Sequence, residues 1–480
     1  MTIHRGVSRS IVLALVVACS SSCRCTSRLG GRIAGFERPR HVVLIVVDTL
    51  RADEVPFLAG ARSTPAMARL ADDGIVFAHA ASAAPWTLPS VASIMTGVDP
   101  LVHGCVETES VLPPGIPTLA EHMHAAGYRT AAAGANPSLK ARTGLARGFD
   151  EYHINVQDWF EEKRIEPPPV EWLEEERRGM FFYTSTPYIE RFALDWIERN
   201  EESDFFLWLH FLDPHGPYYP PPGYRPAGPV SGTALEAIHT RGAARSLGSE
   251  ADRRIMREFY RGEVRWVDDA IGRILDELDA LDLYDGALIV LVSDHGEEFW
   301  DHGGADHGHT LYEELLHVPL VVKLPGRSGR FTHAVLFERV SILGLAPMVL
   351  DACRIEAGVP GGYSLSSLVG LGAAAYAGPP LFAGAVKFGG RRDSVAFGSM
   401  KYIRSAGLGE EIYDLGADPG EESPLAGPSA FLEAGRHLLD LHIEAAGKLA
   451  GDHGAGKQKL RIDEKTREEL EALGYSVDGD

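Results

Sequence analysis

His41-Val42-Val43-Leu44-Ile45-Val46-Val47 is an unbroken apolar run, rich in β-branched residues, and Asp48 follows it directly. Such a run without polar alternation is typical of a strand buried on both faces of a parallel sheet. Two later runs share this character, Phe205 to Phe211 and Ala287 to Val292. The three runs therefore predict the central strands of a large sheet.

Helical patterns lie between these runs and after them. Thr64 to Asp73 and Ile255 to Leu281 place apolar residues at helical spacing. Because strands and helices alternate, the sequence predicts an α/β fold with an open, doubly wound sheet. From about Phe382 short strand-like pieces appear, and two helical patterns follow them, Phe431 to Gly447 and Lys465 to Leu473. This change of pattern predicts a small α+β subdomain at the C-terminus.

The composition is that of a globular protein with a strongly negative charge. The chain has 480 residues, of which 45% are hydrophobic and 24% charged, and its formal net charge is −21. That length fits one large domain with a smaller appendage. The sequence has no basic run that could neutralise a phosphate backbone, which argues against a nucleic-acid partner. The negative charge also disfavours electrostatic adhesion to an anionic membrane.

The N-terminus has the character of an export signal. Basic residues precede an apolar run, Ile11 to Ala18, that is too short to span a bilayer. The run ends at Val16-Val17-Ala18-Cys19, which resembles a bacterial lipoprotein cleavage box. We therefore predict a lipoprotein-type signal over residues 1–19 and a linker over residues 20–40. The protein is then exported to the cell envelope, with a lipid anchor at Cys19 as its membrane contact; an ordinary secretory signal is the alternative.

Carboxylates follow the apolar runs. Asp48, Asp213 and Asp294 each stand at or just after a strand end, and His295 follows the last of them. Because ligands of open α/β sheets bind beyond the carboxyl ends of the strands, we expect these side chains at one edge of the sheet. Burying carboxylates repeatedly is costly unless a cation compensates. A lone aspartate at such a place is more often a helix N-cap, but three together favour a metal site.

A further segment carries a family signature, Ala84-Pro85-Trp86-Thr87-Leu88-Pro89-Ser90-Val91-Ala92-Ser93-Ile94-Met95-Thr96-Gly97. It resembles the active-site motif of the sulfatase family, in the alkaline phosphatase superfamily. Sulfatases have Cys or Ser, oxidised to formylglycine, where this chain has Thr87, and an Arg where it has Val91. Threonine cannot follow that oxidation because its β-carbon carries a methyl group. Its hydroxyl can instead serve directly as a metal-activated nucleophile.

Other motifs similar to those of the family follow in order. They are Asp48-Thr49-Leu50-Arg51-Ala52-Asp53, Asp213-Pro214-His215-Gly216-Pro217-Tyr218, Ser293-Asp294-His295-Gly296-Glu297-Glu298, His307-Gly308-His309-Thr310-Leu311-Tyr312-Glu313-Glu314 and Ile412-Tyr413-Asp414-Leu415. Many sulfatases have a second Asp at the place of Thr49. The resemblance implies an alkaline-phosphatase-like fold, in which helices sandwich a large sheet. It also implies a catalytic domain over residues 41–380 and a C-terminal subdomain with a tail over residues 381–480.

The resemblance further implies a metal site. Carried over residue by residue, Asp48, Asp294 and His295 would bind one divalent metal, with Thr87 as the fourth ligand. Two carboxylates, one imidazole and one alkoxide favour Zn²⁺ or Mn²⁺, and leave Mg²⁺ or Ca²⁺ as alternatives.

Substrate contacts are expected from an amide and several histidines. His215 is implied as an oxyanion contact, and His307 or His309 as an oxyanion contact or the acid that protonates the leaving group. Asn136 could donate to an oxyanion, although it precedes a proline and suits a turn equally well. The alternatives for the histidine-rich segment are a second metal site, with Asp213 or His215 contributing, and a solvated loop.

The prediction that results is a metal-dependent hydrolase of anionic esters with Thr87 as nucleophile. Phosphate or phosphonate esters are favoured over sulfate esters, because the formylglycine route is closed to Thr87. Three alternatives remain: a sulfatase that works without formylglycine, a phosphotransferase acting on an envelope lipid or glycan, and an inactive binding module. The retained Asp48, Asp294 and His295 argue against the last.

Overall fold

The computed structural model describes residues 37–475, apart from residues 56, 58–62, 167–184, 240–243, 245–246, 327–333, 360–363, 367–378, 428, 457, 461 and 474. The predicted export signal, its Cys19 and most of the predicted linker lie outside the described residues. Within the described part of the chain, no helix combines the length and apolar character needed to cross a membrane.

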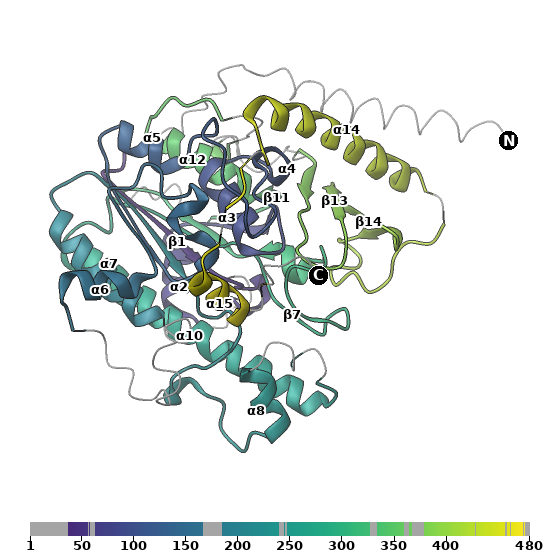
Figure 1. Ribbon diagram of the computed structural model, residues 1–480, viewed down its shortest axis with the longest axis horizontal. Coiled ribbons are helices and arrows are strands. Elements are labelled where there is room, and N and C mark those ends of the chain that lie inside the picture. Colours follow the sequence, from purple (N-terminus) through teal and green to yellow (C-terminus); the bar gives the residue numbers. More distant parts are fainter. Residues whose placement is uncertain are drawn as a thin grey trace.

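A nine-stranded mixed sheet forms the centre of the molecule (Figure 1). The order is β11-β2-β10-β6-β1-β5-β3-β4, and β9 also pairs with β2. The strands are β1 (His41–Val47), β2 (Ile75–Ala81), β3 (Arg129–Gly134), β4 (Glu151–Ile154), β5 (Phe205–Phe211), β6 (Leu288–Ser293), β9 (His317–Val318), β10 (Leu320–Lys323) and β11 (Ala334–Ser341). The three predicted central strands are β1, β5 and β6, and β1 runs parallel between the other two.

A doubly wound fold alone would suggest a purely parallel sheet, but this sheet is mixed. β10 runs antiparallel to both β6 and β2. The chain leaves β6, forms a short hairpin of β7 (Glu298–Phe299) and β8 (Ala305–Asp306), and returns beside β6 through α11 (Glu313–Leu316). A parallel neighbour would need a long crossover connection, which this short return does not provide. An antiparallel neighbour needs none.

Helices cover both faces of the sheet, as predicted. Val42, Leu44 and Val46 of β1 face one apolar cluster, whereas Val43, Ile45 and Val47 face the other. The first layer contains α3 (Thr87–Thr96), α4 (Pro100–His103), α5 (Leu119–Ala125) and α12 (Leu345–Ala352), and the second contains α2 (Pro65–Asp72), α6 (Val156–Lys163), α7 (Thr186–Asn200), α8 (Gly232–His239) and α10 (Glu250–Ala280). The α/β fold with a helix-covered sheet is therefore confirmed. Because the strand alternates between two dry layers, all of β1 is buried.

The C-terminal part adds a smaller antiparallel sheet. Its strands are β12 (Leu381–Ala383), β13 (Arg392–Phe397), β14 (Met400–Ser405) and β15 (Gly409–Asp414), and α14 (Ala430–His453) packs on them. The last helix, α15 (Glu464–Ala472), lies apart from this sheet and packs beside the 3-10 turn η2 (Pro137–Leu139). The chain thus returns to the large sheet at its end (Figure 1).

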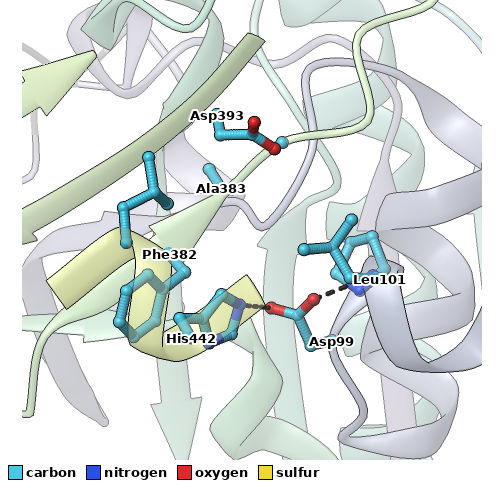
Figure 2. Close-up of a pocket in the computed structure, with 9 residues that line it drawn as sticks. Asp99, Leu101, Phe382, Ala383, Asp393 and His442 are labelled. Carbon is cyan, nitrogen blue, oxygen red and sulfur yellow. Dashed lines mark hydrogen bonds and ion pairs between the residues drawn. The ribbon is translucent and has the colours of Figure 1, made fainter. Parts of the chain in front are cut away.

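A histidine–aspartate pair joins α14 to the large domain. His442 Nε2 lies 3.1 Å from Asp99 Oδ2, and the His442 ring stacks on Phe382 at 3.7 Å. Figure 2 shows the small hollow beside this pair, with the imidazole pointing to the carboxylate. Asp99 also accepts from Leu101 N (2.8 Å), so it caps α4 while it holds α14. The hollow is lined by this joint, and its lining residues include none of the catalytic candidates.

Candidate active site

Asp48 reaches the edge of the sheet because β1 ends at Val47. The next residue, Thr49, has φ of 56°. A β-branched residue in this left-handed region is strained, and such strain concentrates where the surrounding structure fixes a functional turn. The Tyr260 hydroxyl on α10 donates to Thr49 O (2.9 Å) and holds this turn. The Asp48 side chain is thereby fixed at the strand end, fully buried.

Asp294 and His295 follow β6, the neighbour of β1. Both side chains are fully buried. His295 Nδ1 lies 2.9 Å from Gly296 O, and since a carbonyl only accepts, Nδ1 is the protonated nitrogen. His295 Nε2 then presents its lone pair, as a metal ligand requires. This Nε2 lies 3.4 Å from Asp48 Oδ1 and 3.6 Å from Asp294 Oδ2.

Thr87 is the first residue of α3. Its Oγ1 lies 3.5 Å from Asp48 Oδ2 and 3.3 Å from His295 Nε2. The N-terminus of a helix carries a partial positive charge, which favours an alkoxide at this position. The Ser90 hydroxyl on the next turn donates to Asp294 O (2.5 Å) and ties α3 to the strand end. The structure thus brings together the four side chains that the sequence assigned to one metal.

His210 is a further member of this cluster that the sequence analysis missed. It lies inside β5, opposite Val46 of β1, and is fully buried. Its Nε2 lies 3.8 Å from Asp294 Oδ2 and 4.0 Å from Asp48 Oδ2. Neither ring nitrogen has a hydrogen-bond partner among the described residues. The one signal in the sequence was a histidine within an otherwise apolar strand.

The donor set fits a divalent cation. Asp48, His210 and Asp294 each offer a ligand atom within 4.8 Å of the others. Asp294 Oδ2 is buried without a hydrogen bond within the described residues. Burial raises the pKa of Asp294, but the His295 and His210 imidazoles outweigh it and hold the pKa below its ordinary value. Buried carboxylates that lack hydrogen bonds demand a positive charge, and a metal ion supplies one.

The structure shows the turn role of Asn136, and its role as a donor to an oxyanion stays a prediction. Its Oδ1 accepts from Ser138 N (3.0 Å) and caps η2, as a turn residue does. Its Nδ2 donates to Asp48 Oδ2 (2.8 Å) and points to Thr87 Oγ1 (3.2 Å). The amide is therefore fixed by the turn and presents its NH₂ group beside the Thr87 hydroxyl.

Two of the three predicted histidines, His215 and His307, lie near His295 in the site. The rings of His215 and His307 lie 4.9 Å apart, and the His307 ring lies 4.5 Å from the His295 ring. His215 Nδ1 lies 2.6 Å from Gly216 O, and His307 Nδ1 lies 2.9 Å from Glu297 Oε1. Each contact consumes an Nδ1 hydrogen, so both Nε2 atoms are directed inward. Glu297, which orients His307, had no role assigned from the sequence.

His309 and Asp213 are turned to other partners. His309 Nε2 lies 2.7 Å from Glu298 Oε2. Burial lowers the pKa of His309, but the Glu298 carboxylate outweighs it and raises the pKa above its ordinary value. A catalytic role for His309 stays a prediction. Asp213 Oδ2 accepts from the Ser185 and Thr186 hydroxyls (both 2.7 Å) at the start of α7, which is a capping role.

A residue that follows helix α15 also reaches the site. Tyr475 is fully buried, and its hydroxyl lies 3.3 Å from Thr87 Oγ1, 3.2 Å from His307 Nε2 and 3.4 Å from His215 Nε2. Trp86, the N-cap of α3, packs against its ring at 6.1 Å. No motif of the sequence pointed to this tyrosine.

Comparison with known families shows to which family the chain belongs. The family model described as Sulfatase matches residues 40–355, which contain the large sheet and each predicted metal ligand. The chain belongs to the sulfatase family. Members of the sulfatase family hydrolyse ester bonds with the help of a metal ion, so this protein is an ester hydrolase. The predicted family resemblance is confirmed.

Relatives within the sulfatase family are diverse. The multifunctional alkaline phosphatase superfamily protein PehA of Trinickia caryophylli is 27% identical over 361 residues, covering 60% of this chain and 69% of that protein. An arylsulfatase of Clostridium perfringens is 25% identical over 363 residues, covering 66% and 75%. The phosphonate monoester hydrolase of Agrobacterium radiobacter has a similar structure, with a TM-score of 0.66, 20% identity and coverage of 89% and 100%. A 2-O GAG sulfatase gives a TM-score of 0.70 at 20% identity, covering 90% and 96%. These structures support the sulfatase fold.

Proposed function

We propose that this protein hydrolyses phosphate or phosphonate esters with Thr87 as a metal-activated nucleophile. One observation carries the proposal. Thr87 Oγ1, at the N-terminus of α3, lies within 3.5 Å of both a carboxylate oxygen of Asp48 and Nε2 of His295. A hydroxyl in this position is next to the ligands that would hold a cation, which is where an activated nucleophile has to be.

The preference for phosphorus over sulfur rests on threonine chemistry. A sulfatase with formylglycine releases sulfate when its hemiacetal collapses, and that route needs an aldehyde. Oxidation of Thr87 would give a ketone, because its β-carbon bears a methyl group. A simple alkoxide suits phosphoryl transfer, in which the enzyme ester is later cleaved by water.

The proposed reaction has two steps. The Thr87 hydroxyl first gives its proton to solvent. Its Oγ1 then attacks phosphorus, and the bond from phosphorus to the leaving ester oxygen breaks, which gives a phosphothreonine. The leaving oxygen keeps the electron pair and takes a proton from the imidazolium of His215 or His307. The neutral imidazole that remains takes a proton from water as the water oxygen attacks phosphorus, and the bond from phosphorus to Thr87 Oγ1 breaks. Oγ1 departs with the electron pair as the alkoxide, and the imidazolium is restored. Asn136 Nδ2 and the histidine Nε2 atoms hold the oxyanion meanwhile.

Asp48, Asp294, His295 and Thr87 would hold the cation, and His210 is placed to join them. When bound, a divalent metal lowers the pKa of the Thr87 hydroxyl and offsets the phosphoryl charge. A second imidazole adds a nitrogen donor to the oxygen ligands. We therefore propose Zn²⁺ or Mn²⁺ in preference to Mg²⁺ or Ca²⁺.

The proposal includes export to the cell envelope with a lipid anchor at Cys19. It rests on the Val16-Val17-Ala18-Cys19 box alone. Radiolabelled palmitate should be incorporated by the full chain in a bacterial host, and Cys19→Ser should abolish that incorporation. A Cys19→Ser chain that still takes up the label would contradict the anchor.

The test compares wild type and three variants on three chromogenic esters. Thr87→Val keeps the shape and removes the hydroxyl, whereas Thr87→Ser keeps the hydroxyl. We expect Thr87→Val to lower kcat/KM for 4-nitrophenyl phenylphosphonate and bis(4-nitrophenyl) phosphate by on the order of 10³-fold or more. Thr87→Ser should retain a measurable part of the wild-type kcat/KM. Thr96→Val, on the last turn of α3, should keep near-wild-type turnover.

The outcomes separate the candidate functions. Mass spectrometry of quenched wild type should find a phosphoryl adduct on the peptide that contains Thr87. If 4-nitrophenyl sulfate were the best substrate, the phosphorus preference would be wrong. Transfer to an added alcohol in excess of hydrolysis would favour a phosphotransferase. Absence of both bound metal and turnover would favour an inactive binding module.

A further inference from the structure

We propose that the C-terminal segment Asp463–Tyr475 is an intramolecular ligand of the catalytic site, and that substrate must displace it. The Tyr475 hydroxyl takes the place of a substrate oxygen beside Thr87. This inference rests on the proposed function in taking Thr87 as the reacting residue.

The contacts of the Tyr475 hydroxyl are those expected of a substrate oxygen. Its oxygen lies 3.2–3.4 Å from Thr87 Oγ1, His307 Nε2 and His215 Nε2. Reacting atoms in a competent complex lie about 3–3.5 Å apart, so a phosphoryl group attacked by Thr87 needs this same volume. The phenol oxygen and a substrate oxygen cannot both occupy it.

Because the site is buried, Tyr475 and a substrate cannot occupy it at the same time. Thr87 and Tyr475 are fully buried, and His215 and His307 are exposed by 3% and 1%. With Tyr475 in position, an ester from solution has no route to the Thr87 hydroxyl. A catalytic tyrosine, by contrast, would have to leave room for the substrate while it stays in contact with the nucleophile.

Acidic side chains around α15, the helix before Tyr475, form ion pairs with basic side chains near the site. Lys140 is the C-cap of η2, and Arg142 lies in the next 3-10 turn, η3 (Ala141–Thr143). Glu469 of α15 forms an ion pair with Lys140, and Asp463 pairs with Arg142 at 3.0 Å. The tail therefore offers two carboxylates to the basic groups and a hydroxyl to the oxyanion groups. An anionic ester would be recognised through the same chemistry.

Apolar contacts fix the direction of the segment. Leu470 and Leu473 are each 1% exposed and belong to the cluster on the α3 face of the large sheet. Tyr475 N donates to Leu470 O (2.8 Å), which closes the end of α15 and turns the tyrosine inward. This short helix is held by a few buried leucines and two ion pairs, of which Lys140–Glu469 is largely buried and Arg142–Asp463 partly exposed. It is therefore easier to displace than a strand of the sheet.

The expected effect on affinity follows from competition. A ligand that binds only the open form has an apparent Kd raised by the reciprocal of the open fraction. If the segment occupies the site for about 90–99% of the time, its removal tightens binding about 10- to 100-fold. Salt screens the partly exposed Arg142–Asp463 pair, so the effect should shrink at high ionic strength.

The first test measures the Kd of inorganic phosphate by calorimetry on full-length, zinc-loaded protein. Tyr475→Ala should tighten binding about tenfold or more, and Tyr475→Phe should give a smaller gain because its ring still fills the site. Glu469→Gln should also tighten binding, whereas Glu464→Gln, on the exposed side of the same helix, should not. Unchanged or weaker binding in Tyr475→Ala overturns the proposal.

The second test follows displacement directly in the unaltered chain. Saturating phosphate should raise amide hydrogen exchange in residues 464–475 and leave β14 unchanged. If exchange in that segment is unaffected or falls, the segment is not displaced and the proposal fails. Neither readout requires turnover, so an error about Thr87 as the nucleophile would appear in the ester assays alone. A Tyr475→Phe chain that loses turnover while its phosphate Kd is unchanged would make the tyrosine catalytic and overturn the proposal.

Discussion

At the scale of single residues, the site is defined by polar groups that the protein itself leaves incompletely satisfied. Asp294 Oδ2 and both nitrogens of His210 are buried without hydrogen bonds among the described residues. Buried polar atoms are nearly always paired, because an unpaired one costs on the order of 1–3 kcal/mol. Their convergence between β1, β5 and β6 indicates a partner that carries positive charge.

His210 should therefore contribute to metal binding. We expect His210→Gln to weaken Zn²⁺ binding by about 10- to 100-fold, the range seen when a supporting group of a metal site is lost. The measurement is competition with a chromophoric chelator. His153→Gln, a partly buried histidine on β4, is the matched control and should bind like wild type. Equal affinities for both variants would make His210 a core histidine.

The residues that the sequence identified are those whose local context is readable. Asp48, Thr87 and Asp294 each stand in a motif or at a strand end, where an edge position can be inferred. His210 lies inside an apolar run, where periodicity gives no reason to single it out. Tyr475 reaches the site through a contact that spans 388 residues of sequence from Thr87. Contacts of that kind depend on the packing of α15, which no local pattern encodes.

At the scale of elements, the turn after β6 depends on the absence of a side chain. A Cβ on Gly296 would lie 2.0 Å from Glu314 O, the backbone of α11. Gly296 N also donates to Leu315 O (2.8 Å), which fixes α11 against the turn. This close approach explains the glycine after His295, because any side chain would push α11 away from the turn that carries this proposed metal ligand.

Gly296→Ala should consequently damage both stability and the site. Overpacking of this kind costs roughly 1–3 kcal/mol or more, and here it acts on backbone that cannot rotate away. We expect a lower thermal midpoint together with weaker Zn²⁺ binding. Gly286→Ala is the control, since its Cβ would meet no atom closer than 3.8 Å. A Gly296→Ala protein with normal metal affinity would show that the turn does not position His295.

The sequence predicted the strands that are buried on both faces. It did not predict the direction of a strand that is set by its pairing with neighbouring strands. The runs at 41–47 and 205–211 match β1 and β5 because strands buried on both faces are apolar almost throughout, with His41 and His210 as the exceptions. Helix α10 begins earlier than its apolar stripe, at Glu250, because Ser249 accepts from Asp252 N and caps it. The antiparallel placement of β10 depends on a short return through α11, and periodicity carries no information about strand direction.

At the scale of the whole molecule, charged side chains join the small sheet to the catalytic part. Lys401 of β14 lies 3.0 Å from both Glu313 of α11 and Glu421, and all three are buried or nearly so. His302 lies beside them, with Nδ1 2.8 Å from Glu314 Oε1 and Nε2 3.1 Å from Glu421 O. Both ring nitrogens of His302 face acceptors, so the imidazolium suits this joint best.

This geometry predicts a pH-dependent joint. Burial lowers the pKa of His302, but the Glu314 carboxylate outweighs it and raises the pKa to about 9. A histidine whose pKa is higher in the folded state stabilises the fold fully below its unfolded pKa of about 6.5. That stabilisation is lost as the pH rises from about 6.5 to about 9. Since the ring is partly solvated, we expect about 1–2 kcal/mol rather than the full shift.

The check is thermal unfolding of wild type and His302→Gln between pH 6 and 9.5. At pH 6, wild type should unfold at a temperature about 1–3 °C higher than His302→Gln, and this difference should vanish by about pH 9.5. Taking the difference between the two proteins cancels the titration of Glu421 and the other groups of the joint. His124→Gln, an exposed histidine on α5, should follow wild type throughout. A gap between wild type and His302→Gln that is constant with pH would mean that His302 acts through packing on Tyr312, which its ring stacks on at 3.7 Å, rather than through its charge.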